Sequence, residues 1–380
     1  MSDSPTTTDH APIALPARRR DALRQILHTR RFEESLKLGT PPSVRNSALA
    51  GLQAGLTTAI CVPLFLLSPW AHLAGFASLG ALAALFGRFA PRRSRTGIVL
   101  QCAFWQTFAV FAMSATAWLG WSPAAQLALM AISCGFYLLI SFRHHFGAPG
   151  PLIFIFAVGG SMTDTLDLRQ VAERTLATAI AAVFAWLICI ASESLRHPPT
   201  PERTFPKDPE RSLGELGFMA IRVSIAAFIV VYASHALGMN HPAWAAMGAV
   251  AVMQGSHLHI SMHRALQRMA GTLIGATLAW LLLIQQPPAW PIVVALVLLQ
   301  VLTEIIIGVN YGLAQTLITP MALLMTHLAA PTAASAAMAP ERVIDTILGA
   351  IVGMVIALIL SNADDRRSLA HHHQSSRQYG

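Results

Sequence analysis

One apolar helix of this chain begins with the sequence Arg268-Met-Ala-Gly-Thr-Leu-Ile-Gly-Ala-Thr-Leu-Ala-Trp280. A cation leads into it, and its first two turns carry Gly271 and Gly275 with Thr272 between them. Residues four apart lie on one face of a helix, and glycines there remove side-chain bulk, so that a neighbouring helix can approach closely. The stretch therefore predicts tight packing between apolar helices, with Arg268 and Thr272 as the polar groups beside the contact.

The composition indicates a membrane protein. Mean hydropathy is +0.54, and only 12% of the residues are charged, whereas a globular chain carries about 25% charged residues. All four cysteines fall in apolar segments, so we expect neither a disulfide framework nor a zinc site. The first 47 residues are polar and basic, and we expect no cleavable signal peptide there.

Apolar segments follow this basic arm in two groups of six, separated by a polar, proline-rich linker. We expect an all-α integral membrane protein with about twelve transmembrane helices, arranged as two parallel six-helix repeats, each an inverted pair of three-helix units. The expected regions are a cytoplasmic arm (1–47), a first membrane half (48–191), a cytoplasmic linker (192–217), a second membrane half (218–361) and a cytoplasmic tail (362–380). The arm fits either an amphipathic helix on an anionic leaflet or a solvated positive flank.

The distribution of positive charge gives the expected orientation. With both termini in the cytoplasm, 23 of the 26 lysine and arginine residues lie on the cytoplasmic side. The outer side keeps only Arg169, Arg174 and Arg342. This asymmetry follows the positive-inside rule and predicts a multi-pass protein of the bacterial inner membrane.

Internal similarity supports a duplication. The two membrane halves have 144 residues each. Three residue pairs recur at a separation of 168 or 169 positions: His72 and His241, Pro151 and Pro320, and Arg174 and Arg342. Arg342-Val-Ile-Asp-Thr-Ile-Leu-Gly349 also repeats the pattern that begins at Arg268, and Gly353 extends its glycine face. We therefore expect each of these arginines to open the third helix of a three-helix unit.

Two carboxylates are candidates for proton coupling. Glu304 is the one acidic residue well inside an apolar segment, where a charge is costly and usually functional. The alternative is that Glu304 lies near the cytoplasmic end of its helix beside an arginine. Asp345 follows Arg342 by three positions, which predicts an ion pair on one helix face. That pair would serve either as a structural contact or as an outer gate and proton site.

Prolines in two apolar segments suggest a substrate site near the middle of the membrane. Pro320 follows Gln315 and Thr319, and its expected counterpart is Pro151 in Pro149-Gly-Pro151. A proline within a helix frees a backbone carbonyl, and matched helix breaks in transporters mark the binding site. We predict that Arg268, Thr272, Gln315, Thr319, Pro320 and Pro151 contact a substrate. Simple proline kinks are the alternative.

Histidines add one further candidate. His241 precedes a short apolar segment, where it either titrates at the outer face as a third proton-coupling group or caps the helix. The series His257, His259 and His263 resembles metal-ligand spacing only loosely, and we expect no metal. No nucleophile elbow, P-loop or catalytic carboxylate pair is present, so we expect neither an enzyme, nor an ATP-driven pump, nor a cofactor.

The second half resembles the fusaric acid resistance protein-like family of inner-membrane proteins, which includes the aromatic acid exporters. The resemblance rests on His241-Pro-Ala-Trp244, Arg268 to Gly275, Asn310-Tyr311, Thr319-Pro320 and Arg342 to Gly349, in this order. It implies a permease for aromatic or other weak carboxylic acids. Many family members carry a large cytoplasmic domain after each six-helix block, whereas this chain has a short linker and a short tail.

These observations predict a secondary transporter for proton-driven efflux of aromatic or other weak organic acids. The alternatives are a passive organic-anion channel and a non-transporting membrane scaffold. The expected partners are a small organic anion, the lipid bilayer, a second copy of the chain and a periplasmic accessory protein, with no nucleic acid.

Overall fold

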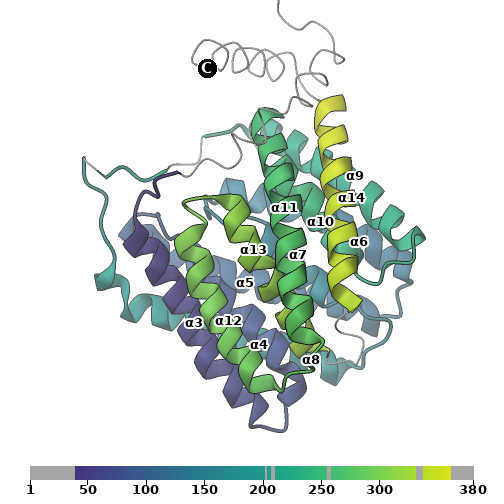
Figure 1. Ribbon diagram of the computed structural model, residues 1–380, viewed down its shortest axis with the longest axis horizontal. Helices are drawn as coiled ribbons and strands as arrows, with labels where there is room; N and C mark the ends of the chain where they lie inside the picture. The colour runs from purple at the N-terminus through teal and green to yellow at the C-terminus, as the bar shows by residue number, and fades with distance from the viewer. Residues whose placement is uncertain (1–38, 202, 207–209, 255–257, 331–336, 361–380) are drawn as a thin grey trace, which may run out of the picture.

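The computed structural model describes residues 39–201, 203–206, 210–254, 258–330 and 337–360. Within these ranges the chain forms twelve α-helices and three short 3-10 helices (Figure 1). The predicted all-α fold is confirmed for the described residues, where one isolated bridge between Thr200 and Arg203 is the only extended pairing. Most of the predicted basic arm, His257 and the predicted tail lie outside the described residues.

The helices are α3 (Val44–Leu66), α4 (Ala74–Ala81), α5 (Arg92–Trp118), α6 (Pro123–Arg143), α7 (Leu152–Gly160), α8 (Leu168–Ala191), α9 (Leu213–Ala236), α10 (Pro242–Met253), α11 (Leu258–Leu283), α12 (Ala289–Ile306), α13 (Tyr311–Ala329) and α14 (Met338–Ile359). Several begin at a polar side chain that accepts a hydrogen bond from the first turn. Asp167 and Ser212 form full capping boxes with Gln170 and Glu215, and Asn310 caps α13. These caps satisfy backbone N–H groups that a helix start leaves without partners.

Nine of the described helices are long and apolar enough to cross a membrane. The other three, α4, α7 and α10, correspond to the predicted segments 71–86, 148–160 and 244–255. The α10 helix has 12 residues and α7 has 9, whereas a straight crossing needs about 20. Each predicted segment therefore contains a helix, but α4, α7 and α10 are too short to cross a bilayer as straight helices.

The short helices form the centre of the bundle, and the long helices surround them. All eight residues of α4 and all twelve of α10 are buried. The α8, α9 and α12 helices bury only 33% of their apolar windows and present leucine, isoleucine and phenylalanine side chains outward. Such an outer surface suits lipid rather than water. The short apolar segments are thus explained by burial in protein instead of contact with lipid.

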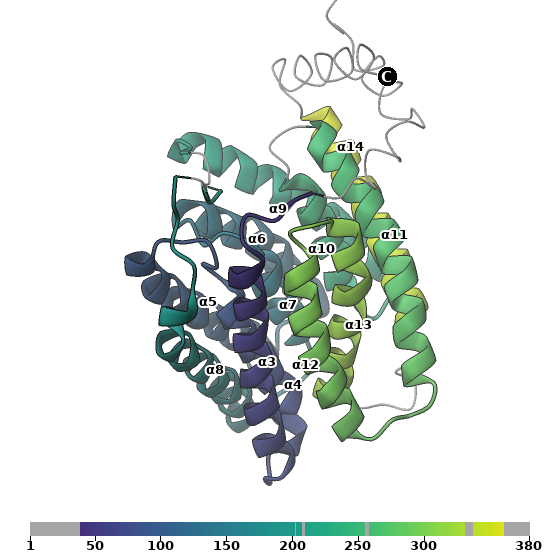
Figure 2. The same cartoon turned by 60° about the vertical axis from the view of Figure 1, so that its left-hand side comes forward.

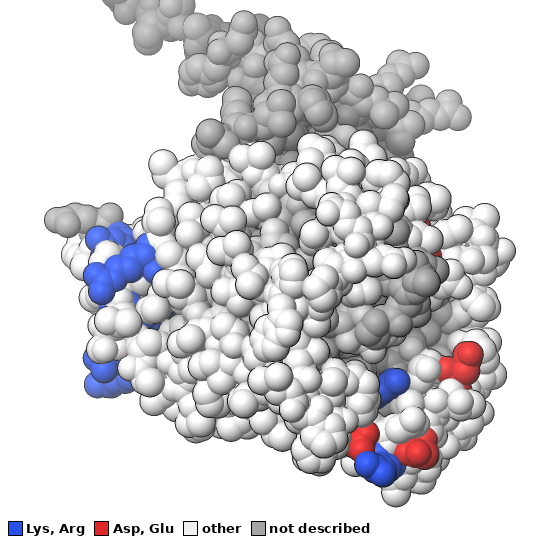
Figure 3. Space-filling view, turned by 60° about the horizontal axis from the view of Figure 1, so that its bottom comes forward, with Lys and Arg blue, Asp and Glu red and all other residues white. Residues whose placement is uncertain are grey.

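The bundle has two distinct ends, which we call inner and outer. At the inner end α3 begins and α14 finishes, and the backbone N–H of Gly39 donates to the carbonyl of Val309 at 2.8 Å (Figure 2). At the outer end the Gln126 side chain donates to the carbonyl of Thr163 at 3.0 Å. Figure 3 shows the outer end with most of its surface uncharged and the charged side chains gathered near its edges. The inner end is the one that the sequence predicts to be cytoplasmic.

Three kinds of contact recur in the two halves with partners 168 or 169 positions apart. They are a glycine packed on a neighbouring helix, a histidine–glutamate pair and an arginine over an aromatic ring. In the first half they are Gly80 against Thr178, His72 with Glu173, and Arg174 over Phe76. In the second half they are Gly248 against Thr346, His241 with Glu341, and Arg342 over Trp244.

Gly271 and Gly275 pack directly on α13, as the sequence predicts. The prediction that Arg268 opens this helix is wrong, because α11 already begins at Leu258 and the glycines lie in its middle. A Cβ at Gly271 would lie 2.5 Å from the carbonyl oxygen of Gly312, and one at Gly275 would lie 2.7 Å from that of Thr316. Gly349 and Gly353 of α14 meet α10 in the same way, with Ala245 and Ala249 opposite them. The predicted glycine packing is confirmed, and it brings the middle of α11 against the segment that contains Pro320.

The described part of the linker folds back on the inner end of the first half. Arg196 donates to the carbonyl of Arg88 at 2.7 Å and to that of Ala90 at 2.9 Å. Arg45 Nη1 donates a hydrogen bond to Nε2 of His197 at 3.1 Å. Desolvation, together with the charges of Arg203 and Arg45, lowers the pKa of His197 below its usual value, so a neutral ring accepts this hydrogen bond. The linker thus fixes the loop that carries Arg88.

Candidate functional site

A cavity of about 450 Å³ lies between the central helices, toward the inner end. Its walls come from α7, α10, α11, α12 and α13 and from non-helical segments at the inner end, including Pro149 and Gln254. Non-helical backbone at membrane depth is tolerated where it lines a cavity, because its polar groups need partners other than lipid. Most of the lining is apolar, and the polar side chains lie on α11, α12, α13 and the loop before α5.

Arg268 is the most deeply buried cation of this inner cavity, with 1% of its surface exposed. Its Nη1 donates to the hydroxyl of Tyr311 at 3.0 Å and to Gln315 Oε1 at 3.4 Å. The Nε and Nη2 atoms have no hydrogen-bond partner among the described residues. A buried guanidinium without a carboxylate is costly, so Arg268 stands out among the residues that line the cavity.

A short network of neutral groups holds Arg268 in place. The Gln315 Nε2 group donates to the hydroxyls of Thr272 at 3.2 Å and Thr319 at 3.1 Å. Thr319 in turn donates to the carbonyl of Gln315 at 3.0 Å. The amide oxygen of Gln315 is thereby left facing Arg268. Four of the six predicted substrate residues, Arg268, Thr272, Gln315 and Thr319, therefore lie together on the α11–α13 contact.

The two prolines differ in position. Pro320 lies inside α13, which continues through it, and its Cδ atom lies 3.0 Å from the position of a Cβ at Gly275. The sequence suggested that Pro151 interrupts a helix. In the structure it precedes α7 as its N-cap residue and does not interrupt that helix. Its neighbours Pro149 and Leu152 line the inner cavity, whereas Pro151 itself does not. The segment that contains Pro151 therefore forms part of the cavity wall, although Pro151 itself does not line the cavity.

Glu304 forms a buried ion pair with Arg88 at the edge of the inner cavity. Arg88 lies in the loop before α5 of the first half, and Glu304 lies on α12 of the second. Both side chains are less than a tenth exposed. The structure thus has the arginine neighbour that the sequence left as one alternative for Glu304. This ion pair also links the first half of the chain to the second half at the inner end.

Neutralising one partner of this pair should destabilise the protein more than neutralising both. Arg88→Gln or Glu304→Gln alone leaves a buried charge without its partner and should cost about 3 kcal/mol, whereas the double variant leaves none. Thermal unfolding in detergent of the four proteins measures this difference. A double variant as unstable as the sum of the two single variants would show that the pair is not coupled.

A second cavity, of about 240 Å³, lies toward the outer end. It is lined by Arg174, His241 and Trp244 together with apolar residues of α4, α7 and α13. The His241 ring stacks on Trp244 with centroids 4.2 Å apart, and its Nδ1 lies 3.2 Å from Glu341. His241 is therefore held at the start of α10 by both contacts.

The predicted ion pair between Arg342 and Asp345 is not formed in the described structure. Asp345 Oδ1 accepts a hydrogen bond from Ser234 of α9 at 2.6 Å, and Oδ2 has no partner. The Arg342 guanidinium instead lies 5.3 Å from the centre of the Trp244 ring of α10. The two side chains lean toward different neighbouring helices, so a spacing of three residues did not bring them together. Both are fully buried.

The structure adds two residues that the sequence did not single out as site residues. Arg88 had counted only as a cytoplasmic charge, and Tyr311 only as part of a family motif. Arg88 has no distinctive sequence signal, since it follows an apolar segment as many topology-setting arginines do. Of the three histidines with loose metal spacing, only the side chain of His263 is described, and it lines the inner cavity. No group of three potential metal ligands gathers in the part searched.

Residues 225–356 match the family described as fusaric acid resistance protein-like. No curated protein and no solved structure matches the chain. The matched segment contains Arg268, Glu304, Gln315 and Arg342. The nine described helices that are long and apolar enough to cross a membrane, together with this match, favour a multi-pass membrane protein.

Proposed function

We propose that this chain, whose residues 225–356 match the fusaric acid resistance protein-like family, is a secondary transporter that exports small organic acids as anions. The observation that carries the proposal is the buried Arg268 on the wall of the inner cavity. Two of its three guanidinium nitrogens have no hydrogen-bond partner among the described residues. A carboxylate that accepted these donors would offset the cost of burying the charge.

The lining of the inner cavity favours a particular class of anion. One end presents Arg268 and Tyr311, while most of the wall consists of leucine, isoleucine and methionine side chains with Phe156. A volume of about 450 Å³ lies within the range of small-molecule sites, roughly 300–1,000 Å³. An aromatic or other weak acid with one carboxylate would place its charge at Arg268 and its apolar body against this wall. The lining and the family match together support aromatic acids as the first substrates to test.

The architecture supports alternating access. Contacts recur between the halves at a separation of 168 or 169 positions, which favours two parallel six-helix repeats. The helices α4, α7 and α10, together with the proline-containing α13, each occupy the middle of a three-helix unit. Discontinuous helices at the centre of inverted units are typical of secondary transporters, in which one unit rocks against another around a fixed site.

Proton coupling is assigned to Glu304 and Asp345, with His241 as a third candidate at the outer end. Glu304 borders the inner cavity, and Asp345 lies near the outer end, so the two carboxylates are separated along the axis of the bundle. A carboxylate in each location would let protons exchange with either side of the membrane. The positive-inside pattern of the sequence supports an orientation with both termini in the cytoplasm of a bacterial inner membrane.

Replacement of the coupling carboxylates tests this assignment. Glu304→Gln and Asp345→Asn proteins in liposomes should lose the part of benzoate flux that depends on the pH gradient and keep the part that depends on the benzoate gradient. Glu210→Gln, at an exposed linker position, is the matched control. Unchanged pH-dependent flux in both variants would remove these carboxylates from the coupling mechanism.

The same liposomes distinguish the two alternatives. A passive channel would give flux that follows the membrane voltage and does not saturate with benzoate concentration. A scaffold would give no flux above that of protein-free liposomes. Saturable flux that responds to the pH gradient supports the transporter.

A further inference from the structure

We infer that Arg342 is a second anion-binding residue, which takes a carboxylate from the inner cavity and passes it toward Arg174 in the outer cavity. This inference rests on the proposed transport of organic anions and specifies the route by which the anion crosses the centre of the bundle. The sequence suggested a different role for Arg342, as one partner of an outer ion pair, and left Arg174 without one.

The first observation is the isolation of Arg342. Its side chain is 0% exposed, and all three guanidinium nitrogens have no hydrogen-bond partner among the described residues. No described carboxylate forms an ion pair with it. Its guanidinium lies over the face of Trp244, 5.3 Å from the ring centre. A cation–π contact offsets only part of the cost of burying an arginine, so this residue lacks a structural explanation.

The second observation is the position of Arg342 between the two cavities. Trp244, beneath its guanidinium, lines the outer cavity. Its charge also lies within interaction range of Arg268, which lines the inner cavity, and of Asp345 on its own helix. Arg342 itself lines neither cavity. It therefore lies behind the Trp244 lining of the outer cavity and within electrostatic range of Arg268 in the inner cavity.

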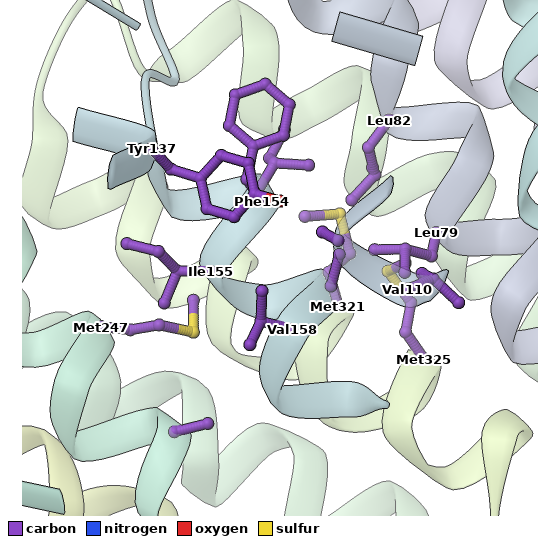
Figure 4. Close-up of a cluster of buried hydrophobic side chains, with 14 of the residues drawn as sticks. Leu79, Leu82, Val110, Tyr137, Phe154, Ile155, Val158, Met247, Met321 and Met325 are labelled. Carbon is purple, nitrogen blue, oxygen red and sulfur yellow. The ribbon is translucent and has the colours of Figure 1, made fainter. Parts of the chain in front are cut away.

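The third observation concerns that wall. Phe156 of α7 and Met325 of α13 line both cavities, so a single layer of side chains separates them. Figure 4 shows Met321 and Met325 with Leu79 and Leu82 in one buried apolar cluster. Methionine side chains are flexible and adapt to changes in packing. Rotation of Met325 and Phe156 would join the cavities beside Arg342 without unfolding a helix.

The outer end of the route has its own cation. Arg174 lies 168 positions before Arg342 and likewise lies over an aromatic ring, that of Phe76. It differs in that it is only partly buried and lines the outer cavity. Its one described hydrogen bond is a long one, 3.5 Å, from Nη1 to the carbonyl of Ser161. Arg268, Arg342 and Arg174 thus form a series of weakly partnered cations from the inner cavity to the outer one.

Such a series lowers the barrier for an anion at the centre of the bundle. A carboxylate that leaves Arg268 would meet the planar guanidinium of Arg342, which can donate two parallel hydrogen bonds to it. Repulsion between the Arg268 and Arg342 charges would be relieved by one shared anion. The carboxylate then remains paired throughout, instead of crossing an apolar layer alone.

Arg342→Met, which removes the charge and keeps an apolar side chain of similar length, tests the inference. The full-length variant is compared with Arg342→Lys and with Arg143→Met, at an exposed position at the end of α6. Three quantities are measured for each protein: benzoate affinity in detergent, benzoate exchange in liposomes and the temperature of thermal unfolding.

We expect Arg342→Met to keep benzoate affinity within about threefold of the unmodified protein, because Arg268 and its hydrogen-bond partners, which bind the carboxylate first, are intact. Exchange should fall by more than about tenfold, because the carboxylate loses its partner midway. The unfolding temperature should stay the same or rise, because an unpaired buried charge has been removed. Arg342→Lys should give intermediate exchange, and Arg143→Met should match the unmodified protein.

Three results would overturn the inference. They are exchange by Arg342→Met within about twofold of the unmodified protein, a loss of affinity equal to that of an Arg268 variant, and a marked fall in unfolding temperature. The last would assign Arg342 a structural role. If Arg342→Met failed to fold, the Arg342→Lys variant would decide. Exchange by Arg342→Lys equal to that of the unmodified protein, together with a lower unfolding temperature of this variant, would also overturn the inference. Failure of the proposed function is distinguishable, because the unmodified protein would then show no saturable exchange of any aromatic acid.

Discussion

Replacing Arg268 by glutamine should lower the affinity of the purified protein for aromatic carboxylates by about a hundredfold, the cost of about 2.7 kcal/mol that loss of a buried charged partner brings. The reason is the arrangement of the inner cavity. Arg268 is its one buried cation without a carboxylate partner among the described residues, since Arg88 is paired with Glu304. Without Arg268, a bound anion would be desolvated with no donor to replace water.

The fold should survive this substitution. The two partners of Arg268 are the neutral side chains of Tyr311 and Gln315, so its removal leaves no carboxylate unpaired. Glutamine can still donate to either oxygen. Isothermal titration of the purified proteins with benzoate measures the affinity, and Arg268→Lys is the control that keeps the charge without the guanidinium fork. Equal affinity in the unmodified protein and Arg268→Gln would place the anion elsewhere.

Replacing Gly349 by alanine should destabilise the bundle by about 3 kcal/mol, at the upper end of the cost of overpacking a core. A Cβ at this position would overlap the carbonyl oxygen of Ala245 and lie 3.0 Å from the backbone N of Ala249. Both obstacles belong to the backbone of the fully buried α10 helix, so neither can move aside by rotating a side chain. The helices α10 and α14 would have to separate.

The matched control is Gly217→Ala in α9. No heavy atom lies within 4 Å of a Cβ at Gly217. Alanine is favoured over glycine in a helix by about 1 kcal/mol, so this variant should be as stable as the unmodified protein or more stable. Thermal unfolding in detergent of the two variants measures the difference. Equal stability of Gly349→Ala and Gly217→Ala would show that α10 and α14 are not in close contact.

The sequence predicted the helices and their close contacts because both depend on local patterns. Apolar segments located all twelve α-helices, and the glycines of Arg268 to Gly275 located the α11–α13 contact. The lengths of α4, α7 and α10 could not be predicted in the same way. An apolar segment is compatible with lipid or with a protein interior, and hydropathy does not distinguish the two. The number of helices that cross the bilayer therefore remains a proposal.

The candidate site was predictable where its residues share one helix pair. Arg268, Thr272, Gln315 and Thr319 were found because polar side chains at helical spacing stand out in apolar segments. The partner of Glu304 was not found, because Arg88 lies 216 positions away in the other half. The role of Arg342 was misjudged for a related reason. The acidic residue one turn later, Asp345, is bound by Ser234 on a third helix, and the adjacent Glu341 pairs with His241.

Counterflow in liposomes tests the central claim, that this protein carries organic anions through a site exposed to each side in turn. Liposomes containing the purified protein are loaded with unlabelled benzoate and diluted into a trace of labelled benzoate, with pH and voltage equal on both sides. The account predicts that labelled benzoate accumulates transiently above its outside concentration, and that Arg268→Gln abolishes this accumulation. Simple equilibration of the label without accumulation, or uptake equal to that of protein-free liposomes, would contradict it.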